Sequence, residues 1–334
     1  MRVTSVAVQA RRRAAALMLL LALSVIGAGC GLVTAGPNPV PALLPTASPT
    51  PLPLPRLLLL GVAAETPLRA SLETWAAERG WLTDSFEANA AGLAAGLSQP
   101  GVQAIVSLGE TPDLRSAFAG PVLVVNGVES AADSHVSVAG EPGARHDQAG
   151  FLAGVLAGLI SRTERVAILT GTGGPHEAVY SAAFDHGLRY GCPRCELVRF
   201  GAAQATAQAL LGEGVDAVFA VPGPTAASTL RSLADADVWM VWCDADGSAR
   251  PGTRLAGEIR MLPEALAAPA LTALLAGEPG RGWPYSVESN SMVLGNLNPE
   301  ALSPGRERVL QEAREGLASG QLQIGVDPLT GVEP

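Results

Sequence analysis

Lysine is absent from this sequence of 334 residues, in which all 22 basic residues are arginine. A chain without lysine cannot form a lysine Schiff base or carry the phosphate-binding G-x-x-x-x-G-K-[ST] loop, which excludes pyridoxal-phosphate enzymes and P-loop NTPases. Aromatic residues make up 4% of the chain, and the net charge is −9. An acidic chain with few stacking side chains is not expected to bind nucleic acid.

Motifs for metals, cofactors and hydrolysis are also missing. The four histidines have no H-E-x-x-H spacing, and no G-x-S-x-G elbow occurs. Residues 171–176 (GTGGPH) resemble a dinucleotide fingerprint, but His176 occupies the position of its last glycine. We therefore expect no cofactor, no metal and no catalytic residue, and we interpret the histidines as solvated or locally hydrogen-bonded. An exported hydrolase is disfavoured for the same reason.

The amino-terminal segment resembles a bacterial lipoprotein signal. Four arginines and no acidic residue precede an apolar run over residues 14–29, which is shorter than the roughly 20 residues of a transmembrane helix. Small residues stand immediately before Cys30, as in a lipobox. We predict a signal peptide over residues 1–29 and a lipid on Cys30, which would hold the protein on the outer face of the cell membrane. An ordinary secretory signal or an uncleaved anchor is the alternative.

Residues 30–55 hold eight of the 26 prolines. Proline fixes φ and removes a hydrogen-bond donor, so this segment is predicted to be an extended tether rather than a helix or a central strand.

Residues 56–334, the body of the protein, are more residues than a single hydrophobic core usually holds, so two lobes are expected. Continuous apolar runs of strand length alternate with helix-length segments, which is typical of parallel sheets covered on both faces. We predict an α/β protein of two doubly wound, Rossmann-like lobes with a cleft between them. Lobe one is expected mainly over residues 56–140 and lobe two mainly over 141–245, with residues 246–334 crossing between the lobes. The runs predict strands at 56–62, 102–108, 121–126, 165–170, 196–200, 215–221 and 238–243, and helices at 67–79, 146–161, 177–191 and 225–234.

Ligands of such sheets bind at the carboxyl ends of the strands. Segments 61–66, 109–111, 126–127, 171–175, 222–225 and 244–246 occupy these ends, and many of their residues are glycine. Asp244 is predicted to contact a ligand, and Asp246 to form a turn. The C-x-x-C of Cys192 and Cys195 follows a predicted helix end and is expected to form a local disulfide, although redox chemistry or half of a zinc site would use the same pattern.

Three segments together resemble the basic membrane protein (BMP) family, namely FLAGVLA at 151–157, RVAILTG at 165–171 and FDHGLRYG at 184–191. The resemblance continues through residues 238–246 and from 295 to 326. Members of this family are lipoprotein substrate-binding components of ABC transporters with the type I periplasmic-binding fold, and typical members bind nucleosides.

The resemblance also implies ligand-binding positions. Asp244 matches an aspartate that accepts from ribose hydroxyls, and Arg260 stands where the family has a lysine. Residues 63–68 replace a loop that carries an aromatic in the family and carries none here. The predicted ligand-binding residues are Glu65, Gly109, Glu110, Asn126, Gly173, Gly223, Asp244 and Arg260.

These observations predict a lipid-anchored solute-binding protein that closes on a small polar ligand and delivers it to an ABC permease. The alternative is a sensory or interaction lipoprotein of the same fold, with a ligand unlike a nucleoside or with none.

Overall fold

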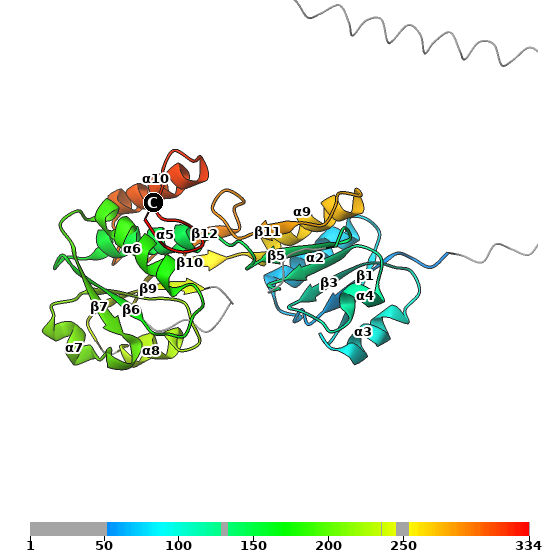
Figure 1. The fold of residues 1–334 in the computed structure, drawn as a ribbon, viewed down its shortest axis with the longest axis horizontal. Helices are drawn as coiled ribbons and strands as arrows, with labels where there is room; N and C mark the ends of the chain where they lie inside the picture. The colour runs from blue at the N-terminus through cyan, green and yellow to red at the C-terminus, as the bar shows by residue number, and fades with distance from the viewer. Residues whose placement is uncertain (1–51, 128–132, 235, 245–253, 334) are drawn as a thin grey trace, which may run out of the picture. The chain divides into compact units, whose positions relative to one another are not determined.

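The computed structural model describes residues 52–127, 133–234, 236–244 and 254–333 (Figure 1). The predicted signal peptide, Cys30 and most of the tether lie outside these residues, as does Asp246. Within the described residues, no helix is both long and apolar enough to cross a bilayer.

The strands are β1 (Arg56–Leu60), β2 (Leu82–Phe86), β3 (Val102–Leu108), β4 (Val122–Val125), β5 (Val136–Gly140), β6 (Arg165–Thr170), β7 (Glu196–Gly201), β8 (Ala217–Ala220), β9 (Trp239–Asp244), β10 (Leu255–Met261), β11 (Gly282–Pro284) and β12 (Met292–Gly295). The helices are α2 (Pro67–Ala77), α3 (Ala90–Leu97), α4 (Leu114–Ala117), α5 (His146–Ile160), α6 (Glu177–Gly191), the 3-10 turn η1 (Ala202–Gln204), α7 (Ala207–Gly212), α8 (Ala226–Ser232), α9 (Pro263–Leu275) and α10 (Pro304–Ala318).

The strands form two sheets with the same strand order. The first sheet has the order β11-β5-β4-β3-β1-β2, and the second has the order β12-β10-β9-β8-β6-β7. All strand pairs in the described residues are parallel except β10–β12. The central strands β4, β5 and β8 are buried throughout, as continuous apolar runs require when helices cover both faces. The predicted doubly wound α/β class is therefore confirmed.

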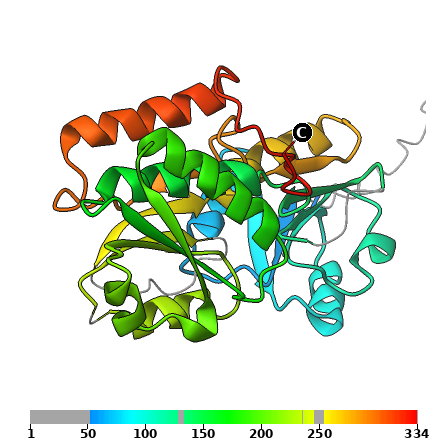
Figure 2. The same cartoon turned by 60° about the vertical axis from the view of Figure 1, so that its left-hand side comes forward.

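The chain passes between the two sheets three times. It leaves the first sheet after β5, returns to it after β10 through α9 and β11, and leaves again to form β12. Helix α9 packs beside α2, where the Trp75 indole N–H donates to Thr272 Oγ1 at 3.1 Å. Figure 2 shows α9 and its neighbouring strand with the first sheet, although their residues come late in the chain.

Helix α5 is buried at every position and packs directly on α6. The contact is so close that a Cβ atom on Gly154 would lie 2.1 Å from the Phe184 carbonyl oxygen, and one on Gly187 would lie 1.9 Å from that of Phe151. Only glycine permits this approach of two backbones. As a result, the first turns of α5 and α6 lie side by side.

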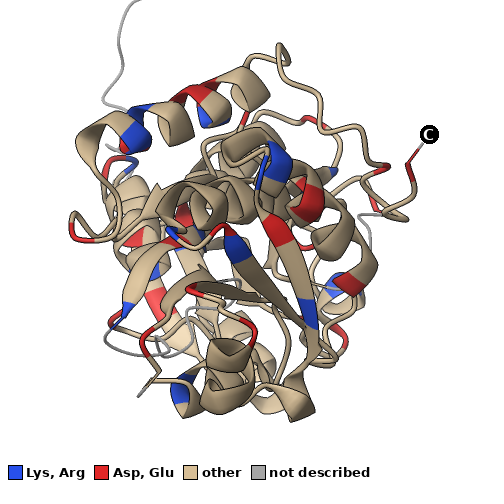
Figure 3. Cartoon of the chain, turned by 90° about the vertical axis from the view of Figure 1, so that its left-hand side faces the viewer, with Lys and Arg blue, Asp and Glu red and all other residues tan. Residues whose placement is uncertain are grey.

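The predicted elements lie within a few residues of the observed ones. Strands β2, β5, β10 and β11, helices α3, α4, α7 and α9, and the turn η1 were not predicted. β2 (LTDSF) is an edge strand, and it is partly exposed along its length. It was missed because such a strand does not need a continuous apolar run. The face of the molecule shown in Figure 3 carries arginines and acidic residues interspersed.

Candidate functional site

In the second sheet, two glycine-rich turns meet at the carboxyl ends of β6 and β8. A Cβ atom on Gly174 would lie 1.9 Å from the Pro222 carbonyl oxygen, and one on Gly223 would lie 2.7 Å from that of Thr172. Thr225 donates from Oγ1 to the same Thr172 carbonyl at 3.1 Å. The strand order reverses between these two strands, so the locked turns form the topological switch point where ligands of doubly wound sheets bind.

In the first sheet, Asn126 and Tyr285 connect two strand ends. Asn126 follows β4 with a left-handed φ of +55°, and its Oδ1 accepts from the Tyr285 hydroxyl at 2.7 Å. Tyr285 is fully buried and directly follows β11. Burial is the main cause that raises the pKa of the Tyr285 phenol, with the nearby Glu141 and Glu264 carboxylates adding to it. The phenol therefore stays neutral and remains a donor to Asn126.

Glu110 lies next to this pair, after β3. Its Oε1 would be 2.7 Å from a Cβ on Gly127, and it is 3.2 Å from an Arg115 guanidinium nitrogen. The Glu110 side chain is 33% exposed. The first sheet thus presents a carboxylate, an amide and a phenol along its carboxyl edge.

A cluster of two imidazoles and a carboxylate lies where the chain leaves the first sheet. Glu141 follows β5, His146 begins α5, and His176 stands immediately before α6. His146 Nε2 is 3.3 Å from Glu141 Oε2, and the two imidazole rings stack with centroids 4.0 Å apart. We call these three residues the Glu-His-His cluster.

Buried side chains contact His146 of the Glu-His-His cluster. His146 Nδ1 is 3.1 Å from the Tyr180 hydroxyl, which is itself 3.8 Å from Cys243 Sγ. Burial raises the pKa of Tyr180 well above its usual value. The adjacent His146 imidazole lowers the pKa of Glu141, while burial lowers the pKa of His176. At neutral pH, Glu141 is therefore ionised and His176 neutral.

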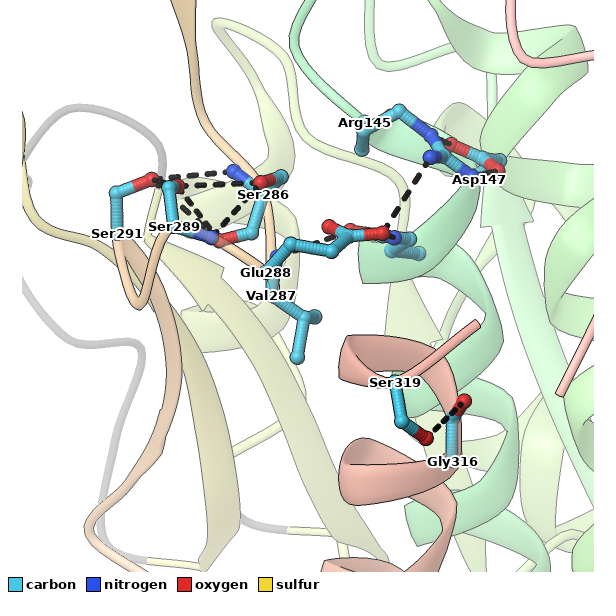
Figure 4. A network of polar contacts seen from close by, with 10 residues as sticks. Arg145, Asp147, Ser286, Val287, Glu288, Ser289, Ser291, Gly316 and Ser319 are labelled. Carbon is cyan, nitrogen blue, oxygen red and sulfur yellow. Dashed lines mark hydrogen bonds and ion pairs between the residues drawn. The ribbon is translucent and has the colours of Figure 1, made fainter. Parts of the chain in front are cut away.

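A second polar network spans the crossings between the sheets (Figure 4). Arg145 donates to both carboxylate oxygens of Asp147, at 2.8 and 2.7 Å, and lies 3.7 Å from Glu288. Gln148 donates to Glu288 at 2.7 Å and accepts from the Val287 backbone N–H at 3.0 Å. The network joins the start of α5 to the segment that links β11 and β12. Three serines on that segment, Ser286, Ser289 and Ser291, bond to one another beside it.

Two cavities open on the described part of the structure, and the first of them adjoins the second polar network. One of about 410 Å³ is lined by Arg145, Asp147, Gln148, Glu288 and residues of the segment after α10. The other, of about 610 Å³, lies at the carboxyl ends of β1 and β2 and is lined by Ala63, Glu87 and Asn89 among others.

The predicted site residues do not all converge. Glu110 and Asn126 lie at neighbouring strand ends, and Gly173 and Gly223 belong to the two turns that meet in the second sheet. Glu65 is exposed in the loop before α2.

Arg260 lies on β10, where it is paired in register with Asp244 of β9. Its guanidinium is 3.5 Å from the buried carboxylate of Glu258, so it has an acidic partner within its own strand. The side chain of Asp244 lies outside the described part of the structure. Cys192 and Cys195 are joined in a disulfide that links the end of α6 to β7.

Several polar residues of this region were not predicted. They are Glu141, Arg145, His146, Asp147, His176, Tyr180, Tyr285 and Glu288. The histidines were interpreted as solvated or locally hydrogen-bonded. His146 is of the second kind, since it is buried and its Nδ1 lies 3.1 Å from the Tyr180 hydroxyl, but its stacking on His176 was not predicted. The signal available in the sequence was the polar start of α5, His146-Asp147-Gln148, ahead of a helix that is apolar in its remaining turns.

Comparison with known proteins agrees with this fold. Residues 123–257 match the model of the Bmp family, described as ABC transporter substrate-binding protein PnrA-like. No curated protein sequence matches the chain significantly.

Three solved structures are similar over most of the described residues. An ABC transporter solute-binding protein from Conexibacter woesei DSM 14684 is 16% identical, with a TM-score of 0.56 over 81% of this chain and 98% of that one. One from Aeropyrum pernix K1 is 14% identical, with a TM-score of 0.54 over 81% of this chain and 93% of that one. A transcriptional activator of the comK gene from Bacillus halodurans is 14% identical, with a TM-score of 0.56 over 80% of this chain and 99% of that one. At such identities, the likeness shows the fold alone.

The matched family consists of substrate-binding proteins rather than enzymes, and its ABC members act outside the cytoplasm. The predicted resemblance is thereby confirmed, and over residues 123–257 this chain matches the PnrA-like family of ABC transporter substrate-binding proteins.

Proposed function

We propose that this protein is a lipid-anchored solute-binding protein on the extracytoplasmic face of the membrane. It would bind a small polar ligand, a nucleoside or a related metabolite, and deliver it to an ABC permease. The observation that carries the proposal is the placement of Glu110, Asn126 and the two locked glycine turns at the carboxyl ends of the strands, in a chain that matches a substrate-binding family.

The ligand would be held by hydrogen bonds from both sheets, with the three crossings serving as the hinge. Glu110 and Asn126 offer oxygen acceptors for ligand hydroxyls, as do Glu65 and, by the family resemblance, Asp244. Gly109, Gly173 and Gly223 would allow the ligand to approach the backbone, and Arg260 would donate. Binding then favours a closed arrangement of the sheets, and no covalent chemistry is required.

A nucleoside panel tests the ligand class. Full-length protein, purified in detergent, should gain thermal stability with at least one nucleoside or purine, by about 2.7 kcal/mol at a ligand concentration 100-fold above Kd. Glu110→Gln should reduce this gain, because an amide replaces a charged acceptor. Glu300→Gln, the same change at an exposed position after β12, should bind as wild type does. A flat response across the whole panel would contradict the nucleoside class.

Such a flat response would favour the alternative, a sensory lipoprotein of the same fold. The exposed loop after β1, which carries no aromatic side chain, is the feature that supports this alternative. Genes for a permease and an ATPase beside this gene would favour transport.

Cys30→Ser tests the anchor. The variant should move from the membrane fraction to the soluble fraction of cells and lose incorporation of labelled fatty acid. Retention of the variant in the membrane with no lipid on the wild type would mean an uncleaved anchor instead.

A further inference from the structure

The Glu-His-His cluster brings together three metal-binding side chains from separate parts of the chain. One carboxylate oxygen and two imidazole nitrogens lie within 4.8 Å of one another. This donor set of two imidazoles and one carboxylate suits divalent transition metals and leaves a position open on a four-coordinate ion. Neither Glu110 nor Asn126, the acceptors proposed for the solute, belongs to the cluster.

His146 is oriented as a metal ligand. Its side chain is 5% exposed, and its Nδ1 is held by the Tyr180 hydroxyl at 3.1 Å. Within the described residues, no hydrogen bond is aligned with Nε2, although Glu141 Oε2 lies 3.3 Å away. In the tautomer in which Nδ1–H donates to Tyr180, the Nε2 lone pair faces the Glu141 carboxylate, and a cation between these two acceptors would bind both.

The distances also suit an ion. Bonds of about 2.0–2.2 Å to a tetrahedral metal place neighbouring donor atoms about 3.3 Å apart, which is the separation of His146 Nε2 and Glu141 Oε2. His176 follows a turn whose Gly171 and Gly173 have positive φ. Its ring stacks on that of His146, and it must turn out of this stack for one of its nitrogens to share an ion with His146 Nε2.

We propose that Glu141, His146 and His176 bind a divalent transition-metal ion, with Zn²⁺ as the representative. The ion ties the end of β5 in the first sheet to the first turns of α5 and α6, which pack on the second sheet. Tyr180 is assigned as a positioning residue: with His146 in its Nδ1–H tautomer, the Tyr180 hydroxyl accepts and Nε2 is left facing the ion. The fourth coordination position is taken by water or by a donor atom of the solute.

Calorimetric titration of ZnCl₂ into the full-length protein, stripped beforehand with a chelator, tests the proposal. We expect one Zn²⁺ per chain. His176→Gln should weaken binding about tenfold or more, since loss of a supporting partner alone costs about 10–100-fold. The matched control is His186→Gln, because His186 lies outside the cluster and pairs with Glu333 at 2.9 Å. The control should bind Zn²⁺ as wild type does.

Spectroscopy separates the proposed site from adventitious binding. Co²⁺ in the wild type should give the visible absorption of a four-coordinate site, and His176→Gln should lose it while its thermal melt without metal is unchanged. Tyr180→Phe should weaken Zn²⁺ binding about tenfold while retaining one site. Absence of Zn²⁺ binding, or equal affinity in wild type and His176→Gln, would overturn the proposal. A nucleoside response without a zinc response would overturn only the metal site.

Discussion

Gly140 shows how one residue without a side chain shapes the strand-end region. It ends β5 with a φ of +108°, and a Cβ atom there would lie 2.4 Å from Asn126 Oδ1 and 3.0 Å from the Tyr285 ring. The missing Cβ therefore leaves the space in which Tyr285 donates to Asn126. A glycine that looks like an ordinary strand end in the sequence is required here for a contact with a residue far away in the chain.

Gly140→Ala should lower the free energy of unfolding by about 2–3 kcal/mol, because positive-φ strain adds to a close contact with Asn126. Urea denaturation measures the loss. Gly277→Ala is the matched control, since Gly277 has a φ of +82° and no atom within 4 Å of the added Cβ. The control should cost about 1–2 kcal/mol from strain alone. Equal losses in the two variants would show that the Asn126 contact costs nothing.

At the scale of elements, the packing of α5 on α6 aligns the Glu-His-His cluster. Gly150, Gly154 and Gly158 on α5 face the backbone or side chains of α6 and its end, and Gly187 faces α5 in return. The short distance between the helix axes brings His146 of one helix beside Tyr180 of the other, 34 residues later in the chain. The glycines thus position side chains that they do not contact.

Gly154→Ala should destabilise the protein by about 3 kcal/mol, because the added methyl would be 2.1 Å from a backbone oxygen and the helices would have to separate. Thermal and urea denaturation measure this. Gly212→Ala on α7 meets no atom within 4 Å, so the better helix propensity of alanine should leave stability unchanged or raise it by up to about 1 kcal/mol. A stabilised Gly154→Ala would contradict the close packing.

At the scale of the whole described molecule, the segments that cross between the two sheets contain a buried charged residue. Asp147 is 1% exposed and is neutralised by two hydrogen bonds from Arg145, which also faces Glu288. The pair stands where the chain turns from the first sheet into α5. Loss of the arginine would leave a carboxylate buried without compensation.

Arg145→Gln should therefore lower the free energy of unfolding by about 3 kcal/mol, at the low end for a buried pair because the Arg145 side chain is 36% exposed. Arg194→Gln is the control, since Arg194 pairs with Glu164 at 2.5 Å but is 82% exposed. This surface pair should contribute about 0–1 kcal/mol. If both variants lose the same free energy of unfolding in urea denaturation, Arg145 does not stabilise the buried Asp147 carboxylate.

The amount that could be predicted differs between the fold and the site. Strands such as β4 and β8 were predictable because each is a continuous apolar run, while β2 was not, since an edge strand has no need of one. Glu110 and Asn126 were predicted at strand ends from the order of elements alone. Tyr285 was missed because its place beside Asn126 depends on a strand added 159 residues later.

By itself, the sequence determined the doubly wound sheets, the buried α5 and the exclusion of lysine chemistry, because periodicity and composition are local properties of the chain. Only the tertiary structure decided which polar groups meet. Glu141, His146 and His176 have no common spacing in the chain, and they converge because helix packing and a chain crossing bring three segments to one point. Those contacts depend on register and approach distance, which no local pattern encodes.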